Sequence, residues 1–180
     1  MLRPRLLRLM TDNPAMESNM DATTARAPDI RPAAPSDESA IDALLRTVHL
    51  PVDGVRDALP NFVIAEDEGR IVGIAGVETC GPTHDHALLR SVAVDPAWQG
   101  KGLGHVLVER ALVIAEARGV KELYLLTTTA ENFFPRFGFA TTTRDAVPAD
   151  VSATAEFQGA CPASATVMVR RAPVAPQPAA

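Results

Sequence analysis

Three glycines at alternate positions, Gly100, Gly102 and Gly104, follow an apolar stretch and open a segment with helical periodicity. Because glycine has no side chain, the backbone N–H groups of such a loop can approach an anion closely. The N-terminus of a helix adds unpaired N–H donors and a partial positive charge. The sequence VAVDPAWQGKGLG, residues 92–104, therefore predicts a phosphate-binding loop.

Two common phosphate-binding motifs fit this loop poorly. A nucleoside-triphosphate loop requires Ser or Thr after GxxxxGK, whereas Lys101 is followed by Gly102. A dinucleotide fingerprint requires GxGxxG, and His105 stands where its last glycine belongs. The acid expected about 20 residues further on would be Glu122, which begins its predicted strand instead of ending it. A dinucleotide-binding module is kept as an alternative, and it would require binding of NAD or FAD.

The glycine loop lies inside a predicted strand–helix–strand unit. Apolar runs at 87–94 and 122–128 predict strands, and an i, i+3/i+4 apolar stripe predicts a helix over 102–118. Gly119 suits the left-handed position that ends such a helix. The two strands of this unit should be parallel and joined by a right-handed crossover.

Other elements are expected on both sides of this unit. An extended piece at 29–31 precedes a helix over 36–49, and a last strand is expected near 166–170. The runs 61–66 and 70–79, joined by Asp67-Glu68-Gly69, predict a tight hairpin. Since hairpins accompany the parallel pair, the sheet should be mixed and the fold class α+β.

Composition predicts one domain without a membrane or nucleic-acid partner. The 180 residues are 47% hydrophobic and 4% aromatic, which indicates an aliphatic core. A net charge of −5 argues against nucleic-acid binding, because phosphate contacts need a basic face. No segment has the roughly 18 apolar residues that would span a bilayer, and we expect a cytoplasmic protein. We predict a domain at 29–171 between a disordered leader, 1–28, and a disordered tail, 172–180.

The two cysteines, Cys80 and Cys161, show no CxxC or CxxH spacing. A structural metal site is therefore not expected. We interpret them as two separate free thiols in a reducing compartment.

The loop Gln99-x-x-Gly102-x-Gly104, directly after VAVDP, resembles the acyl-CoA-binding signature of the GNAT acetyltransferases. The stretches 125–128, 132–134 and 137–139 look like the strand and helix that follow it in that superfamily. The resemblance covers about residues 29–171. The segments LLRSVAVDPAWQGKGLG, ELYLLTTTAENFF, LPVDGV and CPASA look closest to a bacterial group encoded beside arsenic-resistance genes. That group is similar to the acetyltransferase domain of N-acetylglutamate synthases.

The resemblance implies the GNAT fold, with α/β/α layers and a mixed, mostly antiparallel sheet. In that fold a central parallel pair of strands splays to admit acetyl-CoA. The pantetheine would pair with main-chain groups at Val92 and Val94, and the pyrophosphate would lie on the N–H groups of the glycine loop. The cofactor-binding residues so implied are Val92, Val94, Gln99, Gly100, Lys101, Gly102, Leu103, Gly104, His105, Asn132 and Phe134.

The same resemblance implies an N-acetyltransferase that moves an acetyl group to a small amine by direct attack in a ternary complex. It also implies a link to arsenic resistance, and dimerisation is common in the family. Direct attack needs a neutral amine and hence a general base. Glu78, late in its predicted strand, is our first candidate for that base, against the interpretation of a solvated hairpin carboxylate. The alternatives are His84, His86 and Glu131.

The chain departs from the family pattern at Phe134, where a tyrosine usually protonates the leaving thiolate. Phenylalanine cannot donate a proton, so water would protonate the thiolate or it would leave unprotonated. Tyr124, the only tyrosine, lies in a predicted strand and is interpreted as a packing residue. The missing tyrosine keeps a second hypothesis open, a CoA-binding sensor domain without turnover.

Arg90 is a charged residue in an otherwise apolar strand, and such a residue needs a partner. Strand alternation would place it on the same face as Val92 and Val94 unless a bulge intervenes. A guanidinium suits a substrate carboxylate, which would make the acceptor amino-acid-like. A structural salt bridge is the alternative interpretation.

Overall fold

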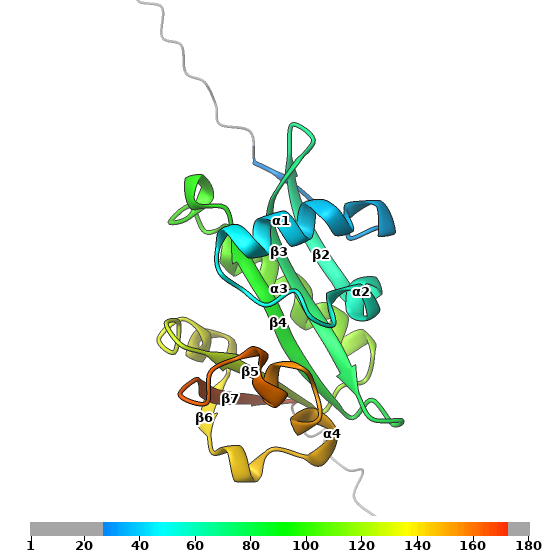
Figure 1. Ribbon diagram of the computed structural model, residues 1–180, viewed down its shortest axis with the longest axis vertical. Coiled ribbons are helices and arrows are strands. Elements are labelled where there is room, and N and C mark those ends of the chain that lie inside the picture. The colour runs from blue at the N-terminus through cyan, green and yellow to red at the C-terminus, as the bar shows by residue number, and fades with distance from the viewer. Residues whose placement is uncertain (1–26, 173–180) are drawn as a thin grey trace, which may run out of the picture.

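The computed structural model describes residues 27–172. The predicted leader and tail therefore lie, apart from residues 27, 28 and 172, outside the described residues. The described chain forms one sheet of seven strands in the order β1-β2-β3-β4-β5-β7-β6, shown in Figure 1. The strands are β1 (Asp29–Pro32), β2 (Phe62–Asp67), β3 (Arg70–Cys80), β4 (His86–Val94), β5 (Glu122–Thr127), β6 (Ala140–Thr142) and β7 (Thr166–Arg171).

Only the central pair β4–β5 is parallel, and every other neighbouring pair is antiparallel. The helices are α1 (Glu38–Thr47), α2 (Val55–Ala58), α3 (Leu103–Ala117) and α4 (Ala149–Ser152). The helix α3 connects the two parallel strands, as the strand–helix–strand pattern predicts. The mixed α+β fold expected from the sequence is confirmed.

Local turn chemistry sets two of the element boundaries. The hairpin β2–β3 closes at Glu68 and Gly69, whose φ angles of 47° and 78° suit a two-residue turn. The helix α3 ends before Gly119, whose φ of 74° is the left-handed conformation expected there.

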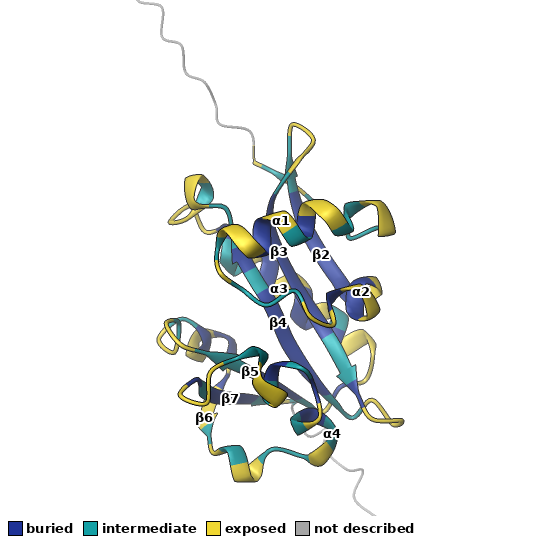
Figure 2. Cartoon of the chain, in the orientation of Figure 1, coloured by how far each residue is buried: buried dark blue, intermediate teal, exposed yellow. Residues whose placement is uncertain are grey.

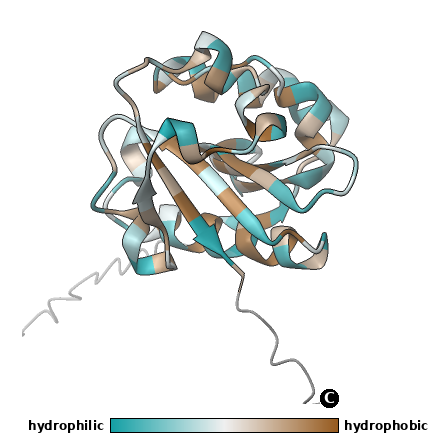
Figure 3. Cartoon of the chain, turned by 90° about the horizontal axis from the view of Figure 1, so that it is seen from below, coloured by the Kyte–Doolittle hydropathy of each residue, from teal (hydrophilic) through white to brown (hydrophobic). Residues whose placement is uncertain are grey.

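Helices cover both faces of the sheet, and the buried residues follow the strands (Figure 2). On one face α3 packs against an aliphatic cluster that includes Leu89, Leu125 and Met168. On the other face α1 and α2 cover Ile64 and Ile74, while the chain around α4 covers a third cluster. Polar segments lie mostly on the loops and outer helix surfaces in Figure 3.

The buried stripe of α3 agrees with its predicted periodicity except at one position. Leu103, Leu107, Ala111 and Ala115 are buried, whereas Val106 is 38% exposed. The loop of three glycines thus precedes a helix that the core fixes firmly against the sheet.

Candidate active site

The parallel pair β4–β5 separates part-way along its length. Ladder partners join residues 86–88 of β4 to residues 122–124 of β5 and no further residues of the two strands. Beyond Leu88 a cavity of about 570 Å³ opens between them, lined by 89–92 of β4 and 125–127 of β5. This separation confirms the splayed central pair expected from the sequence.

Two segments distant in sequence contribute further walls of the cavity, beside the stretch 128–130 that follows β5. The loop between α1 and α2 contributes His49 to Pro51 and Asp53. The chain before β7 contributes Glu156 and the stretch 160–162. The short helix that carries Glu156 spans Glu156–Ala160 with π-type hydrogen bonding, a geometry that is rare and frequent at functional sites.

A β-bulge re-aims the side chains of β4 at the cavity. Ile74 pairs with Ala93 and Gly76 with Arg90, so both Ser91 and Val92 oppose the single residue Ala75. Ser91 has a φ of 54°, a left-handed conformation that costs energy in a serine. Bulges of this kind often occur next to active sites.

The bulge corrects the expected side-chain alternation. Val92 and Val94 pack against the cluster on the α3 face. Arg90 instead contacts Glu78, Asp53 and Glu156 on the opposite face. Arg90 therefore does not share a face with the two valines, because one extra residue inverts the period of two.

Arg90 is the most deeply buried charge lining the cavity, with a side chain that is 0% exposed. Its Nη1 donates a hydrogen bond to Glu78, and its Nη2 donates to the carbonyl of Asp53. Its Nε lies 3.3 Å from Glu156 Oε1, within ion-pair distance but not aligned for a hydrogen bond. Gly54 lets the loop approach so closely, since a Cβ there would lie 2.8 Å from Arg90 Nη1.

Glu156 is a nearly buried carboxyl in the cavity wall, 5% exposed. Loss of solvent raises its pKa above the ordinary value, and the nearby Glu78 charge adds to this, although Arg90 acts in the opposite direction. Its Oε2 accepts a long hydrogen bond of 3.7 Å from the thiol of Cys161. Burial and the neighbouring Glu156 raise the pKa of that thiol to about 11.

Two buried polar atoms in this cavity have no hydrogen-bond partner among the described residues. They are Arg90 Nε and Ser91 Oγ, and both residues line the cavity. Buried polar atoms in proteins are almost always paired. Their position indicates partners that come from a bound molecule or from water.

The glycine loop lies at the end of β4, where Gln99 Nε2 donates to the carbonyl of Val94 at 3.0 Å. Gly100 and Gly102 have φ angles of 74° and 82°, which favour glycine, and a Cβ at either would meet no atom within 4 Å. His105 and Val106 both donate to the Gly102 carbonyl. The space over the loop is open, which fits an anion held by the first N–H groups of α3.

The other predicted cofactor residues are distributed around the cavity and the loop. Val92 and Phe134 line the cavity. Lys101 Nζ lies 4.9 Å from the centre of the Trp98 ring, and His105 stacks on Phe137 at 4.8 Å. Asn132 is exposed on the turn before Phe134.

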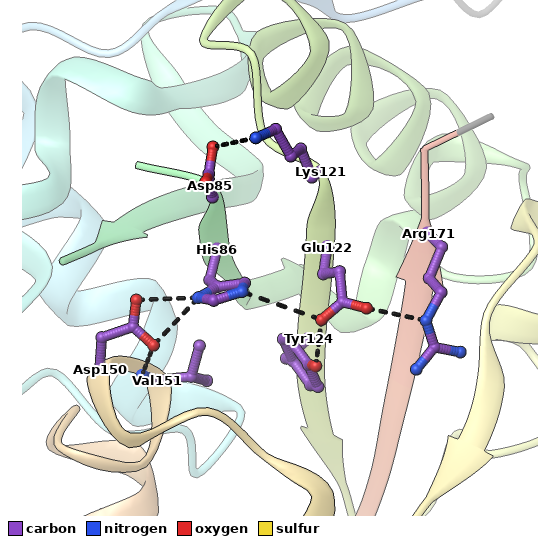
Figure 4. A network of polar contacts seen from close by, with 8 residues as sticks. All are labelled: Asp85, His86, Lys121, Glu122, Tyr124, Asp150, Val151 and Arg171. Atoms are coloured by element: carbon purple, nitrogen blue, oxygen red, sulfur yellow. Dashed lines mark hydrogen bonds and ion pairs between the residues drawn. The ribbon is translucent and has the colours of Figure 1, made fainter. Parts of the chain in front are cut away.

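The predicted base and its alternatives take different positions. Glu78 is next to Arg90, 23% exposed, and is not among the residues that line the cavity. His84 and Glu131 are exposed loop residues. His86 is at the start of β4, where Figure 4 shows it between Asp150 and Glu122.

Tyr124 belongs to the same polar network as His86. Its hydroxyl donates to Glu122 at 2.6 Å, and burial together with this bond raises its pKa. The residue is 2% exposed and packs in the cluster under α4, which confirms its interpretation as a packing residue.

Comparison with known proteins decides the family. The family model described as "Acetyltransferase (GNAT) family" matches residues 22–139. The chain belongs to the GNAT acetyltransferase family. It is 34% identical over 137 residues to an amino-acid acetyltransferase of Mycobacterium tuberculosis, an alignment covering 69% of this chain and 75% of the relative.

Solved GNAT structures share this fold. A Mycobacterium tuberculosis protein crystallised with CoA superposes with a TM-score of 0.68 at 28% identity, covering 81% of this chain and 99% of that one. An N-acetylglutamate synthase from Neisseria gonorrhoeae, with CoA and N-acetyl-glutamate, also gives 0.68 at 26% identity. That comparison covers 79% of this chain and 34% of the synthase. The chain is a GNAT enzyme of the N-acetylglutamate-synthase-like group, an N-acetyltransferase that uses acetyl-CoA.

Sequence reasoning missed Ser91, Glu156 and Cys161 as residues of the cavity. Cys161 begins CPASA, one of the segments that carry the resemblance, but nothing in its spacing placed it beside β4. Glu156 lies in a segment without periodicity.

Both cysteines are free thiols, as expected. Within residues 27–172, no helix combines the length and apolarity needed to cross a bilayer.

Proposed function

We propose that this GNAT enzyme acetylates the amine of a small, amino-acid-like acceptor by direct attack on acetyl-CoA. The observation that carries the proposal is the cavity at the separation of β4 and β5. One side of it is lined by Val92 of β4, the strand that leads into the glycine loop, and the other side is lined by Arg90 and Glu156. The acetyl donor and the amine acceptor can therefore meet in one cavity.

The cofactor side is built from the strand edge and the glycine loop. Beyond Leu88 the main-chain groups of β4 have no ladder partner on β5, so the pantetheine can pair there as an added strand. The pyrophosphate would lie on the N–H groups at the start of α3. We assign this side to Val92, Val94, Gln99, Gly100, Lys101, Gly102, Leu103, Gly104, His105, Asn132 and Phe134.

The acceptor side offers charges that suit an amino acid. Arg90 Nε has no hydrogen-bond partner among the described residues, and the Glu156 carboxylate lies 3.3 Å away. An α-amino acid carries an ammonium and a carboxylate close together, so it matches this pair in charge. The names of the relatives agree, since they include an amino-acid acetyltransferase and an N-acetylglutamate synthase. We propose that Arg90 binds the acceptor's carboxylate.

Catalysis would depend mainly on how the enzyme positions the amine relative to the thioester. Holding the amine against the thioester removes much of the entropic barrier. A main-chain N–H near Val94 would stabilise negative charge on the thioester oxygen during attack. At the position of the usual tyrosine stands Phe134, 6% exposed, which cannot donate. A thiolate whose conjugate acid has a pKa of roughly 8.5 can leave unprotonated at modest cost.

Two expectations from the sequence stay predictions. Glu78 is the base proposed from sequence, and the cavity adds the competing carboxyl of Glu156. The link to arsenic resistance implied by the resemblance would make an arsenical amino acid one acceptor to include in a screen.

The test is release of CoA thiol from acetyl-CoA with a panel of amino acids, compared with simple alkylamines. Saturable turnover with an amino acid supports the proposal. Binding of acetyl-CoA without turnover on the whole panel would favour the sensor alternative, which the missing tyrosine at Phe134 keeps open. Binding of acetyl-CoA is measured by calorimetry, with NAD and ATP as controls.

A substitution in the glycine loop separates cofactor binding from folding. Gly102→Val places a branched side chain at a φ of 82°, in the open space assigned to the pyrophosphate. We expect affinity for acetyl-CoA to fall by at least about tenfold, as loss of one charge-assisted bond would cause. Gly69→Val, at a φ of 78° in the β2–β3 hairpin where a Cβ would meet no atom within 4 Å, is the control for backbone strain.

A further inference from the structure

We infer that Glu156 is the general base of this enzyme, the group that receives the acceptor's ammonium and takes its proton. Glu78, by contrast, positions Arg90. The inference rests on the proposed function and names the proton acceptor in the same site. The two carboxyls that face Arg90, those of Glu78 and Glu156, have different surroundings.

The two carboxyls differ first in position. Glu156 lines the cavity and is 5% exposed, so a molecule in the cavity meets it directly. Glu78 lies on β3, two residues beyond Gly76, which pairs with Arg90, and it does not line the cavity. A general base must lie within hydrogen-bond reach of the proton that it takes.

They differ also in their hydrogen bonds. The carboxylate of Glu78 accepts a hydrogen bond from Arg90 Nη1. Within residues 27–172, the only hydrogen bond to the Glu156 carboxylate comes from the weak thiol donor Cys161, at 3.7 Å. A nearly buried carboxylate with so few donors is costly, and an incoming ammonium would supply the N–H groups that it lacks.

The charges around Arg90 favour the same assignment. Glu78 alone balances the guanidinium, and Glu156 is then a surplus negative charge in the wall of the cavity. The groups that face Glu156 are Arg90 on β4, Glu78 on β3 and Cys161 after its own helix. Burial raises the pKa of Glu156, which brings it closer to the pKa of an amine.

The proton balance is simple. The ammonium gives one proton to the Glu156 carboxylate and becomes a neutral amine. Its nitrogen lone pair forms the C–N bond to the thioester carbon, and the C–S bond breaks with its electron pair leaving on sulfur. The second proton on nitrogen goes to the thiolate, and Glu156 releases the first to solvent. The products are the amide, CoA thiol and one proton.

The experiment compares Glu156→Gln with Glu78→Gln as a matched control. Each variant retains one carboxylate to balance Arg90, so each should fold, as checked by circular dichroism and by calorimetric binding of acetyl-CoA. With the best amino acid from the screen, we expect E156Q to lower kcat at neutral pH by at least about 100-fold. Its kcat should rise with pH as free amine accumulates. E78Q should change kcat by less than about tenfold.

A second acceptor gives a readout that a structural role would not change. Aminooxyacetate has an amine that is already neutral at pH 7, so its acetylation should need no base. The loss in E156Q should shrink to less than about tenfold with this acceptor. If E156Q does not fold, Glu156→Asp, which shortens the carboxyl, is tested with the same pair of acceptors.

Each outcome decides the assignment. Equal losses with both acceptors would show a packing role and overturn it, as would a full loss in E78Q with normal turnover in E156Q. Wild-type protein that turns over no amine would contradict the proposed function itself. Normal wild-type turnover retained in E156Q would contradict the assignment of Glu156 alone.

Discussion

Two polar clusters lie on the same face of the sheet, one where β4 and β5 are paired and one where they have separated. In the paired region His86, Glu122, Tyr124 and Asp150 satisfy one another (Figure 4). In the separated region Arg90 and Ser91 each retain a buried atom without a partner among the described residues.

The difference follows from the strand spacing. Paired strands hold side chains at fixed cross-strand distances, so polar groups can complete each other's hydrogen bonds. Separated strands leave a cavity between them, and polar atoms there can remain without a partner among the described residues. We therefore interpret the His86 cluster as structural and the Arg90 cluster as functional.

The largest expected effect comes from removing the charge of Arg90. Arg90→Leu leaves Glu78 and Glu156 facing each other without a cation. Breaking a buried ion pair by removing one partner costs about 3–5 kcal/mol, so the free energy of unfolding should fall by that order. Urea denaturation at pH 7 measures it. A fall of less than about 1 kcal/mol would mean that the cluster is far more hydrated than its burial indicates.

A smaller effect is expected in the paired region. Asp150→Asn removes a partner that accepts from His86 Nδ1 at 2.9 Å, and we expect a loss of about 1 kcal/mol. Turnover should be unchanged, because Asp150 does not line the cavity. A loss of activity at full stability would contradict the structural interpretation of this cluster.

The carboxyl of Asp150 should also make the stability of the fold depend on pH in the acid range. Burial alone would raise the pKa of Asp150, but the bond to His86, the Val151 N–H and the His86 charge together hold that pKa below its ordinary value. A carboxyl whose pKa is depressed in the folded state stabilises the fold at pH values above its ordinary pKa, and that contribution is lost as pH falls through the depressed pKa. The stability difference between wild type and D150N should therefore shrink in that range.

The smallest effect on stability is expected at Ser91. Ser91→Ala removes a hydroxyl that has no partner among the described residues, so unfolding free energy should change by less than about 0.5 kcal/mol. If the hydroxyl binds a ligand, kcat/KM should fall about fivefold, the equivalent of one hydrogen bond. Ser91→Gly, which also relieves the φ of 54°, is the control. Unchanged kcat/KM in both variants would assign the hydroxyl to water.

The sequence predicted the elements well where local chemistry sets them. The turn at Glu68-Gly69, the stop at Gly119 and the glycine loop each depend on φ angles that few residues adopt. The parallel pair β4–β5 followed from the strand–helix–strand pattern around that loop. The predicted face of Arg90 was wrong, because a bulge at Ser91 leaves no signal in the period-two pattern.

By itself, the sequence determined the family and the mixed sheet with one parallel pair, and through the family resemblance the separation of that pair, since the motifs that carry them are short and have local causes. Only the tertiary structure decided which charges meet. Glu78, Arg90 and Glu156 come from three segments, and Glu156 reaches the cavity only because the chain before β7 folds back over β4. Such contacts depend on long-range packing, which no spacing along the chain encodes.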